Sequence, residues 1–107
     1  AEVYKNQFAI AVCPGDIESP TVLAAQTANE LLDISGINAS FVLTVYQEKI
    51  YMSARSIDEV NVQIIAEKLG GGGHINSAGA QFDHTNMEEA ISTLKETIDD
   101  MIEKGDI

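Results

Sequence analysis

Residues 39–56, ASFVLTVYQEKIYMSARS, decide the fold of this chain because they contain two β-prone runs separated by Gln47 and Glu48. Runs rich in Val, Ile, Tyr and Phe on either side of a two-residue connection are typical of a β-hairpin, so we expect strands over residues 39–46 and 49–56. The connection lacks the Asn-Gly signal of the tightest hairpins, and the register of this hairpin therefore stays open.

Helices are predicted on both sides of this hairpin. Upstream, the apolar residues 7–13 predict a strand, and residues 20–35 predict a helix that begins after the cap residue Ser19 and ends before Gly36. Downstream, residues 58–69 carry apolar side chains at the i, i+3, i+4, i+7 spacing of a helix that covers a sheet.

The C-terminal part of the sequence adds a strand and a third helix. Ala78, Ala80 and Phe82 alternate with Gly79 and Gln81. This pattern predicts a strand over residues 78–82, whose small residues let it lie close to its neighbours. Thr85 and Glu88 form a capping-box pattern ahead of a long helix. The apolar stripe of that helix contains Met87, Ala90, Ile91, Leu94, Ile98, Met101 and Ile102.

The predicted order of elements is β-α-β-β-α-β-α. A hairpin between two crossover connections requires both antiparallel and parallel pairing, so we expect an α/β fold with a mixed β-sheet and flanking helices. At 107 residues the chain has the length of one ordinary domain, and we assign residues 1–107 to a single unit.

The charge of the chain bears on the partners that it can bind. Six basic residues stand against 17 acidic residues, for a net charge of −11. Binding of long nucleic acid depends on several phosphate contacts from Lys and Arg, so this balance disfavours that class of partner. A small phosphate ligand remains compatible with it, because salt screens charges beyond about 8 Å and a local site of oriented donors stays effective.

Four consecutive glycines precede His74 and form the most distinctive local signal. Gly70, Gly71, Gly72 and Gly73 lose much backbone entropy on folding, a cost that a helix stop with one glycine does not incur. Without Cβ atoms their N–H groups can converge on phosphate oxygens. The alternative is a flexible helix-to-strand connection. A Rossmann turn and a P-loop are excluded, since the run follows a helix and no Gly-Lys-Ser or Gly-Lys-Thr comes after it.

Arg55 is the only arginine of the chain and ends the second strand of the hairpin. A guanidinium fixed at a strand end can donate two parallel hydrogen bonds to a phosphate, a geometry that Lys does not reproduce. The neighbouring Ser53 and Ser56 can supply further hydroxyl donors or cap the next helix. Among so many carboxylates a surface ion pair is the alternative for Arg55, and the residues alone leave both interpretations open.

The sequence shows neither a metal-binding pattern nor a nucleophilic triad. No Cys cluster, HExxH or HxxEH motif is present, and no Ser lies in a Gly-x-Ser-x-Gly elbow. We therefore expect no metal ion held by this chain alone and no catalytic residue in it. Cys13 is expected to pack in the interior, and His84 to lie in a turn.

Several motifs follow one another in the order Ser53-x-Arg55-Ser56, a helix, and Gly70-Gly71-Gly72-Gly73-His74-x-Asn76-Ser77-Ala78. This set resembles the DHH-associated (DHHA) domain of DHH-family phosphoesterases, and it is most similar to the C-terminal domain of GdpP-type cyclic-di-AMP phosphodiesterases. Ser77 stands where many members have alanine, which leaves the backbone role of the loop intact. The resemblance implies that this domain closes over the phosphate and base of a substrate. The substrate-binding residues that it implies are Arg55, Ser53, Gly71, Gly72, Gly73, His74 and Asn76.

In that family an N-terminal DHH domain holds two manganese ions and activates water. No Asp-His-His sequence occurs here, so we expect the metal centre in a separate DHH domain of a larger phosphodiesterase, and this chain to be inactive alone. The implied ligand is a cyclic or linear dinucleotide. The implied location is the cytoplasmic side of a membrane, with any anchor outside this sequence, and homodimerisation of the parent protein stays open.

Two other functions stay open beside this one. The chain can be the clamp domain of a nanoRNase or RecJ-like exonuclease, although its acidic balance argues against long strands. It can also be a non-catalytic nucleotide sensor. Comparing cyclic-di-AMP, linear diadenylate and longer oligonucleotides as substrates separates the first two, and tight nucleotide binding that a metal domain does not improve would favour the sensor.

Overall fold

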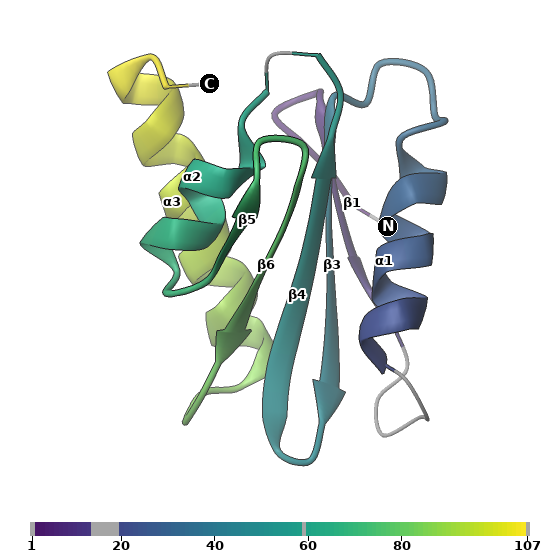
Figure 1. Cartoon of the computed structure of the whole chain (residues 1–107). Coiled ribbons are helices and arrows are strands. Elements are labelled where there is room, and N and C mark those ends of the chain that lie inside the picture. The colour runs from purple at the N-terminus through teal and green to yellow at the C-terminus, as the bar shows by residue number, and fades with distance from the viewer. Residues whose placement is uncertain (1, 14–19, 59, 107) are drawn as a thin grey trace.

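The computed structural model of this chain describes residues 2–13, 20–58 and 60–106. In chain order its elements are β1 Glu2–Tyr4, β2 Phe8–Val12, α1 Pro20–Leu31, β3 Ala39–Tyr46, β4 Lys49–Ser56, α2 Val62–Lys68, β5 Gly72–His74, β6 Ser77–Phe82 and α3 Met87–Lys104. The strands form one sheet in the order β1-β2-β3-β4-β6-β5, and Figure 1 shows α1 on one side of it and α2 with α3 on the other. The predicted α/β class with a mixed sheet and flanking helices is confirmed.

The sheet contains both parallel and antiparallel strand pairs, as the predicted crossover connections and hairpin require. β2 runs parallel to β3, with Phe8 opposite Ala39, whereas β3 and β4 are antiparallel. The hairpin has the expected bounds and closes where Tyr46 pairs with Lys49. Its two connecting residues, 47 and 48, both have positive φ, 50° and 67°. Two left-handed residues suit the twist of a tight hairpin, so the hairpin closes without the Asn-Gly sequence that favours such a turn.

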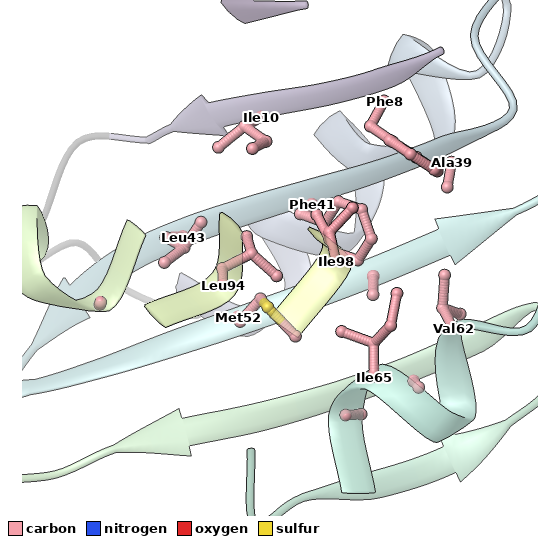
Figure 2. Packing of buried hydrophobic residues seen from close by; sticks show 14 of the residues in the cluster. Phe8, Ile10, Ala39, Phe41, Leu43, Met52, Val62, Ile65, Leu94 and Ile98 are labelled. Carbon is pink, nitrogen blue, oxygen red and sulfur yellow. The ribbon is translucent and has the colours of Figure 1, made fainter. Parts of the chain in front are cut away.

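The main hydrophobic core lies between the sheet and the pair α2 and α3 (Figure 2). Phe41 and Leu43 project from β3 to this side and meet Leu94 and Ile98 of α3, which are fully buried. Val42 alternates to the opposite side of β3, as successive residues of a strand do. There it joins a smaller cluster of Cys13, Ala24 and Ala28 that packs α1 against the sheet, which confirms the buried position predicted for Cys13.

Two short strands were not predicted. β1 lies at one edge of the sheet, where Tyr4 pairs with Phe8 of β2. Its contacts with α3 are distant in sequence: the Tyr4 hydroxyl donates to Asp99 at 2.7 Å, and Lys95 donates to Glu2 at 2.8 Å. The hydrogen bond to the Asp99 carboxylate, helped by burial and by the nearby negative charges, raises the pKa of Tyr4 to about 12. The other added strand, β5, is formed by part of the glycine run and lies at the opposite edge.

Two predicted helices have bounds that differ from the observed ones. The first helix stops at Leu31 instead of residue 35, because the next N–H groups bond three residues back and tighten the chain into turns. The second begins at residue 62, where the Asn61 side chain accepts from the N–H of Ile64. The predicted cap at Ser19 lies outside the described residues.

The capping box predicted for the last helix is wrong by one residue. Asn86 is the cap, since its side-chain oxygen accepts from the N–H of Glu89 at 2.9 Å. Thr85 instead donates its hydroxyl to the Glu89 carboxylate. Asn caps a helix at least as well as Thr, so the helix starts from the nearer of two suitable residues. His84 precedes this cap with a φ of 56°, in the bend where a turn residue was expected.

Candidate substrate-binding site

A hollow of about 560 Å³ lies on the face of the sheet that carries α1. In Figure 1 α1 lies towards β3, on the side away from β5 and β6, and it packs mainly against β3 and β4. Within the part of the chain that the structure describes, no helix covers the far half of that sheet face. The lining residues are Ala25, Tyr51, Met52, Ser53, Arg55, Gly70 to Gly73, and Ser77 to Gln81.

The register of β4 and β6 explains which side chains meet on the floor of this hollow. Residues 51, 53 and 55 alternate with the buried Met52 and Ala54 of the core, so they face the opposite side of the sheet. Their partners on β6 are Gln81, Gly79 and Ser77, in that order. Cross-strand partners share a face, so polar or very small residues form the floor from one end to the other.

Arg55 lies at one end of the hollow, opposite Ser77. Its Nη1 donates to the carbonyl oxygen of Ala54 at 2.8 Å, and its side chain is half-buried. The ion pairs within residues 2–13, 20–58 and 60–106 all involve lysines. In this part of the chain, therefore, no carboxylate oxygen lies within 4.0 Å of the Arg55 guanidinium. A guanidinium has five N–H donors, so most of them remain for a ligand. This arrangement favours anion binding over the surface ion pair.

The first two glycines of the run serve the end of α2. Gly70 has a φ of 89° and donates its N–H to the carbonyl of Glu67, and Gly71 donates to the carbonyl of Ala66 at 2.8 Å. These two bonds form a Schellman motif, in which a left-handed glycine lets the chain satisfy the last carbonyls of a helix. The N–H groups of Gly70 and Gly71 are therefore already used within the fold.

The glycines at positions 71 to 73 differ in the atoms that surround them. A Cβ on Gly71 would lie 2.1 Å from the carbonyl oxygen of Gly79, and one on Gly73 would lie 2.5 Å from the Cα of Ala78. Both positions require glycine because the run lies directly against β6. Gly72 has nothing within 4 Å of a Cβ and no positive φ, although it lines the hollow. It is the glycine of β5 whose missing side chain the fold does not explain.

His74 and Asn76 do not line the hollow. His74 is exposed and pairs with Ser77, which in turn pairs with Arg55, so it lies one strand beyond the rim. Asn76 lies in the β5–β6 turn and donates its amide to the Ser56 hydroxyl at 2.9 Å and to the carbonyl of Asp58 at 3.3 Å. It thus holds the turn against the β4–α2 connection, and its contact with substrate stays a prediction.

Replacing Asn76 by Ala is expected to lower the free energy of unfolding by about 1–2 kcal/mol, because the part-buried Ser56 hydroxyl loses a donor. Chemical denaturation measures this. Asn29→Ala, on an exposed position of α1, removes a similar side chain and should change the stability by less than about 0.5 kcal/mol. Equal stabilities of the two variants would mean that the amide of Asn76 does not hold the turn.

Among the lining residues that escaped the sequence analysis are Tyr51 and Gln81, which have long polar side chains. Tyr51 faces the hollow two residues before Ser53 on the same strand, and Gln81 is its partner on β6. The alternation of β4 was a usable signal, since a strand that presents residues 53 and 55 to one face also presents residue 51. Nothing in the sequence signalled Gln81, because its position depends on the pairing of two strands separated by α2. Ser56 alternates to the other face, where its hydroxyl donates to the carbonyl of Val60 at 2.6 Å.

The chemistry offered by the hollow is that of an anion site with neutral polar walls. Within the part of the chain that the structure describes, no three His, Cys, Asp or Glu side chains come together as a metal site would require. In the same part, no helix is long and apolar enough to cross a membrane. The hollow presents a guanidinium, serine hydroxyls, a phenol and an amide, all of which can form hydrogen bonds with a ligand.

A family model described as "DHHA1 domain" matches residues 5–103. The chain belongs to the DHHA1 family. This DHHA1 domain is 44% identical over 99 residues to the cyclic-di-AMP phosphodiesterase PdeA of Listeria monocytogenes, covering 92% of this chain and 15% of PdeA. It is 43% identical over 106 residues to the cyclic-di-AMP phosphodiesterase GdpP of Bacillus subtilis, covering 96% of this chain and 16% of GdpP. The DHHA1 domain thus spans about one sixth of these relatives.

A more distant relative of the DHHA1 domain is the bifunctional oligoribonuclease and PAP phosphatase NrnA of Thermus thermophilus, 35% identical over 65 residues, or 61% of this chain and 20% of NrnA. Among solved structures, an exopolyphosphatase-related protein from Bacteroides fragilis superposes with a TM-score of 0.79 at 24% identity, over 94% of this chain and 31% of that one. At this identity the likeness concerns the fold. The resemblance to DHHA domains that the motifs indicated is confirmed.

Proposed function

We propose that this DHHA1 domain is the substrate-binding part of a phosphodiesterase and that its hollow holds one phosphate and one base of cyclic-di-AMP or of the linear dinucleotide derived from it. The observation that carries the proposal is the position of Arg55 and Gly72 on the same hollow. Arg55 supplies charged N–H donors that no carboxylate of the described residues pairs with. Gly72 has no side chain, so a ligand can approach the backbone at this position. The volume of about 560 Å³ lies within the usual range of small-ligand sites.

Arg55 acts on the phosphate through two parallel hydrogen bonds, each of which is charge-assisted. The backbone of β5 comes close to the anion because Gly72 has no side chain. Ser53 and Ser77 border this position and contribute hydroxyl donors. The contribution to the reaction rate is positioning, since the scissile ester must be held in line with the attacking water.

The hydrolytic chemistry belongs, in this proposal, to a DHH domain of a longer parent chain that holds two manganese ions and activates water. Support comes from the relatives named cyclic-di-AMP phosphodiesterases, which are about six times as long as the segment matched here. The parent chain is membrane-anchored with this domain on the cytoplasmic side. This domain alone binds nucleotide but does not hydrolyse it.

Gly72→Ala is expected to weaken nucleotide binding without unfolding the domain. A methyl group at this position enters space that the fold leaves empty but that the ligand needs. We expect the affinity for linear diadenylate, measured by NMR titration of backbone amides, to fall by at least about tenfold, which corresponds to about 1.4 kcal/mol. The melting temperature should stay within a few degrees of the wild-type value, because nothing within the domain contacts the added atom.

The same variant tests turnover in the parent chain that includes the metal domain. There kcat/KM for cyclic-di-AMP should fall by a similar factor, since the loss arises from substrate positioning. Wild-type affinity and wild-type turnover in Gly72→Ala would reject the proposed phosphate position. Hydrolysis of cyclic-di-AMP by the 107-residue chain alone would reject the division of work between the two domains.

A second candidate, a clamp for short RNA, is favoured by the similarity to NrnA of Thermus thermophilus, which is named an oligoribonuclease. Comparing cyclic-di-AMP, linear diadenylate and a longer oligoadenylate in one turnover assay of the parent chain separates the candidates. The net charge of −11 leads us to expect the longest substrate to be the poorest. Preferential cleavage of the longest substrate would reverse the ranking.

A further inference from the structure

Tyr51 and Gln81 lie at the end of the hollow opposite to Arg55, and the phosphate site does not use them. They pair with each other across β4 and β6, and both line the hollow. Tyr51 lies four positions before Arg55 on β4, which corresponds to about 13 Å along an extended strand. A nucleotide whose phosphate contacts Arg55 and whose ribose lies over the small floor residues Ser53 and Gly79 therefore directs its base towards this pair.

The side chain of Gln81 is exposed, and one hydrogen bond orients its amide. Its Nε2 donates to the Oδ1 of Asp83 at 2.8 Å. An ionised carboxylate only accepts hydrogen bonds, so the NH₂ group of Gln81 and not its carbonyl must face Asp83. The carbonyl oxygen Oε1 consequently points away from Asp83, and no donor from the described residues reaches it. The hydrogen bond to Asp83 thus leaves the carbonyl oxygen of Gln81 as the atom that can accept a hydrogen bond from a ligand.

We propose that Gln81, oriented by Asp83, determines the base preference of the hollow by accepting a hydrogen bond from an exocyclic amino group, so that adenine is preferred to a 6-oxopurine. This inference rests on the proposed function. Adenine carries an amino donor at its 6-position, whereas guanine and hypoxanthine carry a carbonyl acceptor there. Two facing carbonyl oxygens repel each other, so the acceptor that attracts one base disfavours the others. Tyr51 offers its ring to the face of either base, which adds affinity without selectivity.

AMP and IMP are the probes for this inference because both are 5′-phosphorylated purine nucleotides, and IMP lacks the amino groups of both adenine and guanine. Their dissociation constants for the 107-residue chain are measured by NMR titration of backbone amides. Wild type is expected to bind AMP about tenfold more tightly than IMP, the usual effect of one hydrogen bond. Gln81→Ala should bring the ratio close to one. Tyr51→Ala should weaken both nucleotides by about tenfold and leave the ratio unchanged.

Asp83→Asn is the decisive variant. Its side-chain amide can donate to Gln81 as well as accept from it, so the carbonyl of Gln81 is no longer held in one orientation, and the AMP to IMP ratio should fall below that of wild type. Removing one negative charge also strengthens binding of both phosphates, but it does so equally and leaves their ratio untouched. Asp33→Asn removes the same charge at an exposed position outside the hollow and should keep the wild-type ratio.

The outcomes separate this inference from the proposed function. Equal affinity of wild type for AMP and IMP, or an unchanged ratio in Asp83→Asn, overturns the inference about Gln81 while the phosphate site stands. Binding of neither nucleotide by wild type overturns the proposed function and the inference with it. Loss of both nucleotides in Arg55→Ala, together with a lowered ratio in Asp83→Asn, supports both.

Discussion

Arg55→Ala is expected to lower the affinity of the domain for nucleotide phosphate about 100-fold, or about 2.7 kcal/mol. Arg55 has no carboxylate partner within the described residues and lines the hollow, so most of its donors are available to an anion. Each charge-assisted hydrogen bond contributes roughly 1.5–3 kcal/mol. Solvent screens the half-buried guanidinium, so we expect the binding free energy of the two bonds together to lie near the lower end of twice that contribution. Isothermal titration with linear diadenylate measures the change.

Two further variants distinguish the geometry of Arg55 from its charge. Arg55→Lys keeps the charge but loses the paired donors, so we expect an intermediate loss of about tenfold. Lys104→Ala removes one positive charge at the far end of α3, at the cost of an exposed ion pair with Asp100, and should bind nucleotide as wild type does. Equal binding by wild type and Arg55→Ala would remove the basis of the proposed phosphate site.

Gly71→Ala is expected to cause the largest loss of stability, about 3 kcal/mol in the free energy of unfolding. The added Cβ would lie 2.1 Å from the carbonyl oxygen of Gly79 and 2.7 Å from the Cα of Ala80, and both are backbone atoms that cannot rotate away. The run must therefore move off β6, which also strains the two bonds that end α2. For a domain of this size the melting temperature should fall by roughly 10 °C or more.

The neighbouring Gly72→Ala is the matched control for this effect. It makes the same chemical change one residue later, where a Cβ meets nothing within 4 Å. Chemical denaturation and thermal melting of the two variants should therefore differ by most of the 3 kcal/mol expected for Gly71→Ala. Equal losses in both variants would mean that the glycine run does not lie against β6 in the way described.

The local pattern of the sequence predicted the main elements because each of them buries a regular apolar face. The hairpin was predicted with its correct bounds, and the stripe of the last helix contains the buried residues Ala90, Leu94, Ile98 and Met101. The predicted helix start was wrong where two neighbouring residues can both cap the helix, as Thr85 and Asn86 can for α3. The strands β1 and β5 escaped prediction because three residues are too few for a periodic signal, although each pairs with the next strand along the chain.

The substrate-binding role of the candidate residues stays a prediction, although the structure brings several of them to one hollow. Arg55, Ser53 and Gly72 line one hollow, as the motif suggested. The sequence alone could not show that Gly71 uses its N–H to end α2 or that Asn76 holds a turn. Both roles depend on atoms brought together by folding.

By itself, the sequence determined that this chain forms a hairpin between two helix-containing crossovers and that one arginine precedes a glycine run, because these are properties of neighbours along the chain. Only the tertiary structure decided which glycine must lack a side chain for the fold and which one faces the hollow. It also brought Tyr51 beside Gln81 on the same hollow as Arg55. The physical reason is that strand register and backbone contact distances depend on how the whole sheet is assembled, and no local preference encodes them.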